Sequence, residues 1–432
     1  MDGLDKVLAA IDPRLCVACK GSRGLCGIDP CPLLQRIQHT MPRIVRDAPG
    51  RALSRDLFGS SPPSLFVGRH GYPKVSIGPM LPPEHRDDEA ARLLDAPRTW
   101  MGMTIPDVVG LRSSLLRTTH PVAVDMAARF PDRITRVSQE LAVAARPVDT
   151  EVHLSKAPRF GLPTVGEFTA PHGPTVEVQR AILAENVRVE RPVEKATSDT
   201  DLRASEAIVG LYGGGTDLYQ LERILSAGMV GLANKRRLVP TRWSITATDD
   251  QVGKALIERV LDLPTIDKPL VHFGERFGNR FHVLLLPRVW GFDNVEAWGQ
   301  GSFWTQAGGG RADAPEIVSA ADWEDHTGRT NYAANTAGGY YATRLSVLEH
   351  LVAAGRQATA IVLREVTDDY TTPLGVWVVR ETAKLAMASK PLAFEDLESA
   401  VRHIDRRALH KPWQRDSHLL ELARTQRSLD AY

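Results

Sequence analysis

The sequence contains no run of 18 or more apolar residues, which excludes a hydrophobic helix that spans a membrane. Its opening residues, Met1 to Arg14, carry acidic side chains early and include no apolar core segment, so they do not resemble a secretory signal. We therefore expect a cytoplasmic protein without a membrane partner.

The sequence also lacks an excess of charge of either sign, because 53 Lys and Arg side chains balance 52 Asp and Glu. This near neutrality excludes a histone-like coat protein, so any contact with nucleic acid has to come from a local basic patch. Apolar residues make up 43% of the chain and charged residues 24%, as in ordinary globular proteins. A chain of 432 residues with this composition can bury a sizeable core in two or three domains.

Cysteine is nearly absent, and the four that exist lie in one short segment, as Cys16, Cys19, Cys26 and Cys31. A disulfide-stabilised secreted protein of this length would spread its cysteines, so the cluster indicates a reducing compartment and one special site. Four thiolates at this spacing favour a tetrahedral, structural Zn²⁺ site. An iron–sulfur cluster is the second interpretation, since four cysteines also hold those clusters, and plain thiols are the third.

The order of the predicted elements favours an α/β or α+β fold with a mixed-sheet body. We expect a hairpin over residues 64–77 with its turn at 71–73, and a helix over 217–227. Continuous apolar runs predict strands over 281–286 and 374–379.

Changes in composition suggest four regions. The expected parts are a zinc-binding module over residues 1–40, an N-terminal body domain over 41–290, a C-terminal domain over 291–413, and a helix with a flexible C-terminal tail over 414–432.

Polar and aromatic side chains interrupt the apolar blocks of the body at three places. An arginine beside an aromatic ring suits a phosphate with a stacked base, and a polar cluster before a buried strand can form a phosphate clamp. Ion pairing at the edge of the core is the alternative interpretation. The candidate nucleotide or DNA contacts are Arg69, Tyr72, Arg242, Trp243, Ser244, His272, Arg276 and Arg280.

No familiar catalytic signature appears in the sequence, which has no P-loop, no His-Glu-x-x-His and no Gly-x-Ser-x-Gly. The acidic run from Asp322 to His326 is able to supply carboxylates to Mg²⁺, as a nuclease needs, but an acidic surface at a helix start is the favoured interpretation. No catalytic residue is assigned, and whether the protein is an enzyme stays open.

The end of the chain carries the pattern Gln426-x-x-Leu429-x-x-Tyr432, which resembles the motif that DNA-processing proteins use to bind the sliding clamp PCNA. A single 3₁₀ turn places residues three apart on one side. Leu429 and Tyr432 would then enter one apolar pocket while Gln426 makes a polar contact. A frayed terminus is the other interpretation.

The cysteine cluster, this tail and four blocks between them resemble the archaeal Nre family of DNA repair proteins. The blocks are residues 61–75, 239–246, 338–345 and 373–381. The resemblance implies a role in DNA damage repair, with PCNA bound through the tail. It also implies that the four cysteines are zinc-finger ligands. It implies no catalytic reaction.

The first hypothesis is therefore a nucleoid-associated repair factor whose tail tethers it to PCNA and whose body contacts DNA or a nucleotide. Tethering raises the local concentration, so a modest affinity for the clamp suffices. Other repair proteins are further partners under this hypothesis. A metal-dependent nuclease or nucleotide-processing hydrolase targeted to the clamp is the alternative, and a non-enzymatic repair adaptor is the second alternative.

Overall fold

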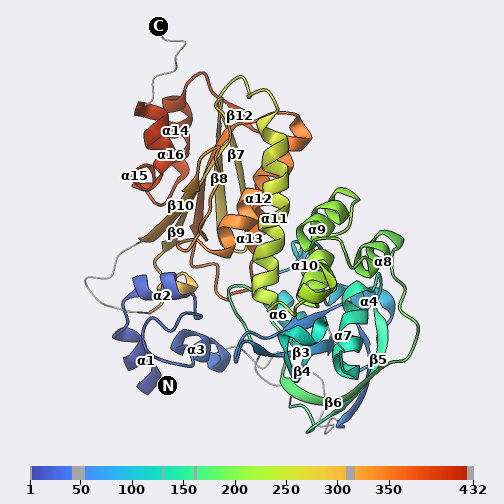
Figure 1. The fold of residues 1–432 in the computed structure, drawn as a ribbon. Helices are drawn as coiled ribbons and strands as arrows, with labels where there is room; N and C mark the ends of the chain where they lie inside the picture. Colours follow the sequence, from blue (N-terminus) through green and yellow to red (C-terminus); the bar gives the residue numbers. More distant parts are fainter. Residues whose placement is uncertain (1, 41–53, 129–130, 160–162, 308–316, 426–432) are drawn as a thin grey trace. The chain divides into compact units, whose positions relative to one another are not determined.

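The computed structural model describes residues 2–40, 54–128, 131–159, 163–307 and 317–425, which form two compact units (Figure 1). Unit 1 comprises residues 1–37, 166–168 and 253–432, and unit 2 comprises residues 38–165 and 169–252. Each unit contains a mixed six-stranded sheet with helices packed against it, so the predicted mixed α/β body is confirmed. Among the described residues, no helix combines the length and the apolar character that crossing a membrane requires.

The sheet of unit 2 has the strand order β1-β5-β6-β4-β3-β2, in which only β4 and β6 are parallel neighbours. Its strands are β1 (Asp56–Ser61), β2 (Leu65–Val67), β3 (Lys74–Leu81), β4 (Leu116–Ala123), β5 (Val148–Leu154) and β6 (Thr175–Leu183). Its helices are α4 (Asp88–Leu93), α5 (Pro97–Trp100), α6 (Ile105–Ser113), η1 (Val124–Ala127), α7 (Arg133–Val143), α8 (Arg191–Ser198), α9 (Ala204–Gly213), α10 (Leu218–Ser226) and η2 (Ala233–Lys235). The predicted hairpin is confirmed as β2 and β3, and the helix expected over 217–227 is confirmed as α10.

Helix α7 covers one face of the unit 2 sheet. Its apolar residues Ile134, Val137 and Leu141 repeat at helical spacing and are buried against the strands. On the opposite face, Phe58 of β1 and its cross-strand partner Glu151 of β5 are exposed. The sheet therefore buries one face here and presents the other to solvent, as antiparallel sheets commonly do.

The sheet of unit 1 has the strand order β10-β9-β11-β8-β7-β12, in which only β9 and β11 are parallel neighbours. Its strands are β7 (Leu270–Arg276), β8 (Asn279–Leu286), β9 (Gly291–Gly299), β10 (Ile317–Glu324), β11 (Thr359–Val366) and β12 (Leu392–Ala393). Its helices are α1 (Asp2–Ala9), α2 (Pro13–Cys19), α3 (Pro32–Thr40), η3 (Phe303–Thr305), α12 (Gly338–Ala354), α13 (Trp377–Ala388), α14 (Leu397–Arg407), α15 (Trp413–Asp416) and α16 (His418–Thr425). The strand expected over 281–286 is confirmed within β8, whereas the strand expected over 374–379 is wrong, because helix α13 begins at Trp377.

Helices cover both faces of the unit 1 sheet, with α14 to α16 on one side and α12 and α13 on the other (Figure 1). Side chains alternate along a strand, so Val295 and Ala297 of β9 join the apolar core under α14 to α16, whereas Asn294 and Glu296 face α12. Helix α12 lies close to this polar side, since a Cβ atom at Gly339 would be 2.3 Å from Glu296 Oε1. The sheet thus has one apolar face and one face rich in polar side chains.

Helix α11 (Thr241–Leu261) begins in unit 2 and ends in unit 1. Residue 290, where the sequence suggested a domain boundary, lies between β8 and β9 of a single sheet. The segment that carries the cysteines belongs to unit 1.

Candidate functional site

The cysteine segment folds as two short helices joined by a glycine-rich loop. Cys16 and Cys19 lie on α2, whose N-terminus Asp12 caps, and Lys20 ends this helix in the left-handed conformation with φ 47°. The loop then returns and places Cys31 directly before α3. All four cysteines line one small, mostly apolar cavity of about 10 Å³, which is close to the smallest cavity that admits one water molecule.

The electrostatics of this cavity disfavour several thiolates unless a cation joins them. Burial raises the pKa of the Cys16 thiol to about 12, and the neighbouring cysteines add to the shift. Burial also raises the pKa of Cys31. For Cys19 burial acts in the same direction, but backbone N–H groups of the loop outweigh it and lower the pKa. One of them, the Arg23 N–H, donates to Cys19 Sγ with the nitrogen 3.3 Å from the sulfur.

The chemistry of this donor set fits a structural Zn²⁺, since the four thiols share one cavity and no disulfide joins them. Within the described ranges, however, no three His, Cys, Asp or Glu side chains are already arranged as ligands of a metal ion. Binding would therefore have to draw the four sulfur atoms together, and zinc remains a prediction.

A buried charge network joins the cysteine segment to the unit 1 sheet. Lys20 Nζ donates to Glu296 Oε2 at 2.9 Å, and Arg364 Nη1 donates to Glu296 Oε1 at 2.7 Å. All three side chains are almost completely buried. Although burial raises the pKa of the Glu296 carboxyl, Lys20 and Arg364 outweigh it and hold the pKa below its usual value. Arg364 also donates to Asn279 Oδ1, so the network crosses three strands.

Two of the predicted contacts, Tyr72 and Trp243, meet on the surface of unit 2. Their ring centroids are 5.2 Å apart with the planes tilted by 59°, and the side chains are 53% and 42% exposed. Tyr72 lies in the turn between β2 and β3, and Trp243 lies on the first turn of α11. The Val67 N–H donates to Thr241 Oγ1 at 2.9 Å, which ties the two segments together beside the ring pair.

The predicted contacts near this pair differ in accessibility. Arg69 and Arg242 flank the aromatic residues in the sequence and are half-buried. Ser244 is buried, and its hydroxyl donates to Thr241 O within α11, so its side chain serves the helix.

The remaining predicted contacts lie in unit 1 and not with the aromatic pair. His272 is fully buried, and burial lowers its pKa to about 4. Arg276 lies over the Phe277 ring at 4.7 Å. Arg280 makes ion pairs with Glu275 at 3.3 Å and Glu365 at 3.5 Å. The structure therefore joins Tyr72 with Trp243 but does not place His272 at an accessible surface.

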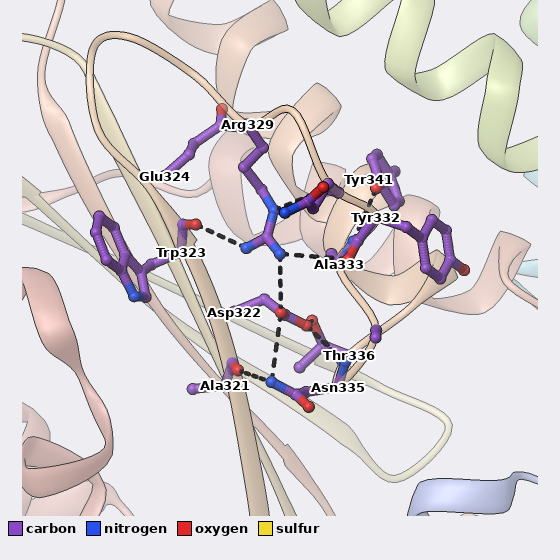
Figure 2. Close-up of polar contacts among 12 residues, drawn as sticks. Ala321, Asp322, Trp323, Glu324, Arg329, Tyr332, Ala333, Asn335, Thr336 and Tyr341 are labelled. Atoms are coloured by element: carbon purple, nitrogen blue, oxygen red, sulfur yellow. Dashed lines mark hydrogen bonds and ion pairs between the residues drawn. The ribbon is translucent and has the colours of Figure 1, made fainter.

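The carboxylate of Asp322, considered above as a magnesium ligand, organises the loop before α12 (Figure 2). Its Oδ2 accepts hydrogen bonds from the backbone N–H groups of Asn335 (2.9 Å) and Thr336 (2.7 Å) and from Thr336 Oγ1 (3.0 Å). Arg329 Nη2 lies 3.2 Å from Oδ1 and forms an ion pair. Both oxygens are engaged in holding the chain, so the geometry assigns this aspartate a structural role.

Helix α16, which leads to residue 426, is anchored to unit 1. Asp293 Oδ2 accepts hydrogen bonds from Ser417 Oγ (2.8 Å) and from the Leu419 N–H (2.9 Å), while the His418 ring stacks on Trp323 with centroids 3.9 Å apart. Leu420 is fully buried against the sheet. The predicted clamp contacts Gln426, Leu429 and Tyr432 lie outside the described residues.

The carboxyl of Asp293 makes the stability of the folded chain depend on pH. Burial raises the pKa of Asp293 to about 6 from the ordinary 3.8, and the nearby Asp322 carboxylate adds to the rise. The folded state then holds this proton more tightly than the unfolded chain. The protonated Asp293 carboxyl therefore makes its full contribution to the free energy of unfolding below pH 3.8. This contribution is lost as the pH rises through about 6.

Replacing Asp293 with asparagine is expected to remove this component, since the amide oxygen still accepts from Ser417 and Leu419. Between pH 5 and 7.5 the stability difference between wild type and Asp293→Asn should shift in favour of the variant by on the order of 1 kcal/mol. Thermal unfolding at several pH values measures it, with Asp368→Asn, at an exposed position of unit 1, as a control. A difference that stays constant with pH contradicts the assignment.

No local pattern in the sequence marks Asp293 or Lys74, which follows Tyr72 by two residues, because both are ordinary surface residue types. One usable signal existed. Residues 57–83 and 223–248 contain no Asp or Glu but hold seven Lys and Arg, and they carry Tyr72 and Trp243 respectively.

Comparison with known proteins gives consistent matches along the chain. The family description "Archaeal Nre, N-terminal" matches residues 25–305, and "Archaeal Nre, C-terminal" matches residues 324–432. A protein named DNA repair protein NreA from Haloferax volcanii is 40% identical over 81% of this chain and 82% of its own length. From Archaeoglobus fulgidus, a DNA repair protein NreA is 37% identical over 92% of this chain and 95% of its own, and a DNA repair protein NreB is 35% identical over 90% and 92%. No solved structure matches the chain.

Proposed function

The chain belongs to the archaeal Nre family, and from this premise we propose that it is a DNA repair protein held at the sliding clamp PCNA by its last seven residues. The relatives reported above are named DNA repair proteins, and the match with this chain covers 82%, 95% and 92% of their lengths. The observation that carries the tethering is the clamp-like pattern Gln426-x-x-Leu429-x-x-Tyr432, which the family match includes, since it runs to residue 432.

The position of α16 supports this role for the tail. The helix is fixed to unit 1 at its start by Asp293 and along its length by Leu419 and Leu420, and it ends at Thr425. The motif begins at the next residue. A binding segment that directly follows an anchored helix keeps the protein close to its partner, which raises the effective concentration of the body on DNA beside the clamp.

The proposal includes a structural zinc ion and contact between the body and DNA. The four cysteines would hold the ion and fix the loop between α2 and α3, because tetrahedral Zn²⁺ ligation closes a short chain segment without a core of its own. DNA contact is supported by the two acid-free, basic segments of unit 2, whose charge suits a phosphate backbone in an otherwise neutral chain.

Removing the tail is expected to abolish binding to PCNA. Leu429 and Tyr432 would be the apolar anchors, and anchors of this kind contribute about 2 kcal/mol or more each, or roughly 30-fold in affinity. A chain that ends at Thr425 and a full-length chain with Leu429→Ala and Tyr432→Ala should therefore both lose measurable binding in calorimetry or surface plasmon resonance with PCNA of the same organism.

The matched control is Ser428→Ala, a change between Gln426 and Leu429 at a position that the motif leaves variable. This variant should bind like the wild type. Wild-type affinity in the truncated chain, or no binding by the full-length protein, would remove the tethering proposal and leave the family assignment standing.

A further inference from the structure

We infer that Tyr72 and Trp243 form a stacking platform for the bases of single-stranded DNA. The inference rests on the proposed DNA contact and adds the class of nucleic acid and the residues that recognise it. A single exposed aromatic side chain is ordinary on a protein surface, but exposed apolar side chains that gather in one patch mark interaction sites. Two of them, from segments far apart in the sequence, meet here with ring centroids 5.2 Å apart.

The platform is held rigidly from below. Tyr72 follows Gly71, which takes a φ of 83°, and the turn is closed by hydrogen bonds from the Tyr72 N–H to Arg69 O and from the Lys74 N–H to Gly71 O. Trp243 sits on α11, a helix of 21 residues. The Val67 to Thr241 hydrogen bond joins the two supports. A preorganised pair loses little conformational freedom when a base stacks on it.

The charge around the platform suits a phosphate backbone. The two segments that carry the rings hold no carboxylate, and Lys74 is exposed two residues from Tyr72. Cations beside exposed rings are the usual combination in proteins that bind single strands.

A single strand fits these features better than a duplex. In a duplex the faces of the bases are already stacked on one another, so exposed aromatic rings gain nothing from it, and only the phosphate contacts remain. A single strand offers free base faces to the rings and its phosphates to the exposed Lys74. Stacking also tolerates any base, so the platform predicts little sequence preference.

The test is fluorescence anisotropy of the full-length protein with a labelled thymidine oligonucleotide and with a duplex of the same length. The single strand should bind more tightly than the duplex. Trp243→Ala and Tyr72→Ala should each weaken single-strand binding by about 5- to 150-fold, since one stacked base contributes on the order of 1–3 kcal/mol. Trp243→Phe and Tyr72→Phe retain a ring and should recover much of the loss.

Two further variants separate stacking from charge. Lys74→Gln should reduce the slope of log affinity against log salt by about one, whereas Trp243→Ala should leave the slope unchanged. Tyr332→Ala removes a tyrosine that is similarly exposed in unit 1 and should have no effect.

The possible results separate the stacking platform from the more general proposal that unit 2 contacts DNA. Equal affinity for duplex and single strand, with no loss in the alanine variants, overturns the platform while the proposed DNA contact stands. No binding to either nucleic acid overturns both. Preference for the single strand that disappears in Trp243→Ala supports the platform.

Discussion

Replacing Lys20 with methionine is expected to destabilise unit 1 by about 3–5 kcal/mol, because it leaves the buried carboxylate of Glu296 short of one of its two cations. Methionine nearly preserves the length of the side chain, so the change removes the charge more than the packing. Lys20 Nζ lies 2.9 Å from Glu296 Oε2 and 5.1 Å from the Trp298 ring centroid, deep in the layer between the cysteine segment and the sheet. Water cannot readily replace the ammonium group there.

Thermal unfolding measures this effect, and the midpoint should fall by on the order of 10 °C. Lys6→Met is the matched control, since Lys6 is an exposed residue of α1 in the same segment. The double variant Lys20→Met, Glu296→Gln should lose less stability than the sum of the losses in the two single variants. The reason is that Glu296→Gln removes the charge that Lys20→Met leaves unpaired. Lys20→Met with the same midpoint as Lys6→Met would show that the ion pair contributes little.

Local sequence patterns were sufficient to predict those helices and strands whose structure depends mainly on their own residues. The apolar run of β8 and the hairpin of β2 and β3 follow from alternation and turn residues, and both are confirmed. The run from Leu374 to Val379 failed because a short apolar stretch does not separate a buried strand from a buried helix. In the structure, residues Trp377 to Ala383 are all buried, so no exposed face reveals the helical period.

The start of α12 shows how tertiary packing overrides local propensity. Gly338 and Gly339 read as a helix breaker, yet the helix begins there. A Cβ atom at Gly339 would clash with Glu296, and one at Gly338 would lie 2.8 Å from Val376 Cγ2. Glycine is required by neighbours that are distant in the sequence, and no local pattern contains that information.

The candidate sites divide in the same way. The cysteine cluster is local, so its spacing alone marks it, and the structure brings the four thiols to one cavity. The meeting of Tyr72 with Trp243 depends on how the β2–β3 turn packs beside α11, so the sequence could suggest each residue but not the pair. A histidine such as His272 is chemically able to bind a ligand. Only the structure shows that it is buried and so cannot contact one at the surface.

Loss of a cysteine ligand is expected to have the largest effect of any single change in the chain. If the proposed zinc ion is present, the purified protein holds one zinc per chain, and Cys26→Ser releases it. Zinc binding provides about 10–16 kcal/mol of folding free energy in small zinc modules, so the segment from α1 to α3 should unfold. Metal analysis and the thermal midpoint measure the two effects. An iron–sulfur cluster would instead give a coloured protein that contains iron.

The matched control for this change is Leu25→Ser, which introduces the same residue at an exposed position of the same loop. It should keep both the zinc and the midpoint. Unchanged zinc content in Cys26→Ser, or a metal-free chain with the wild-type midpoint, would contradict the proposal.

The proposed zinc site and the ion pair between Lys20 and Glu296 are coupled, because Lys20 follows Cys19 directly. Unfolding of the segment withdraws Lys20 from Glu296, so a chelator should lower the stability of the unit 1 sheet as well. In Lys20→Met the contact with Glu296 is already lost. A chelator should therefore lower the stability of the unit 1 sheet by less in this variant than in the wild type.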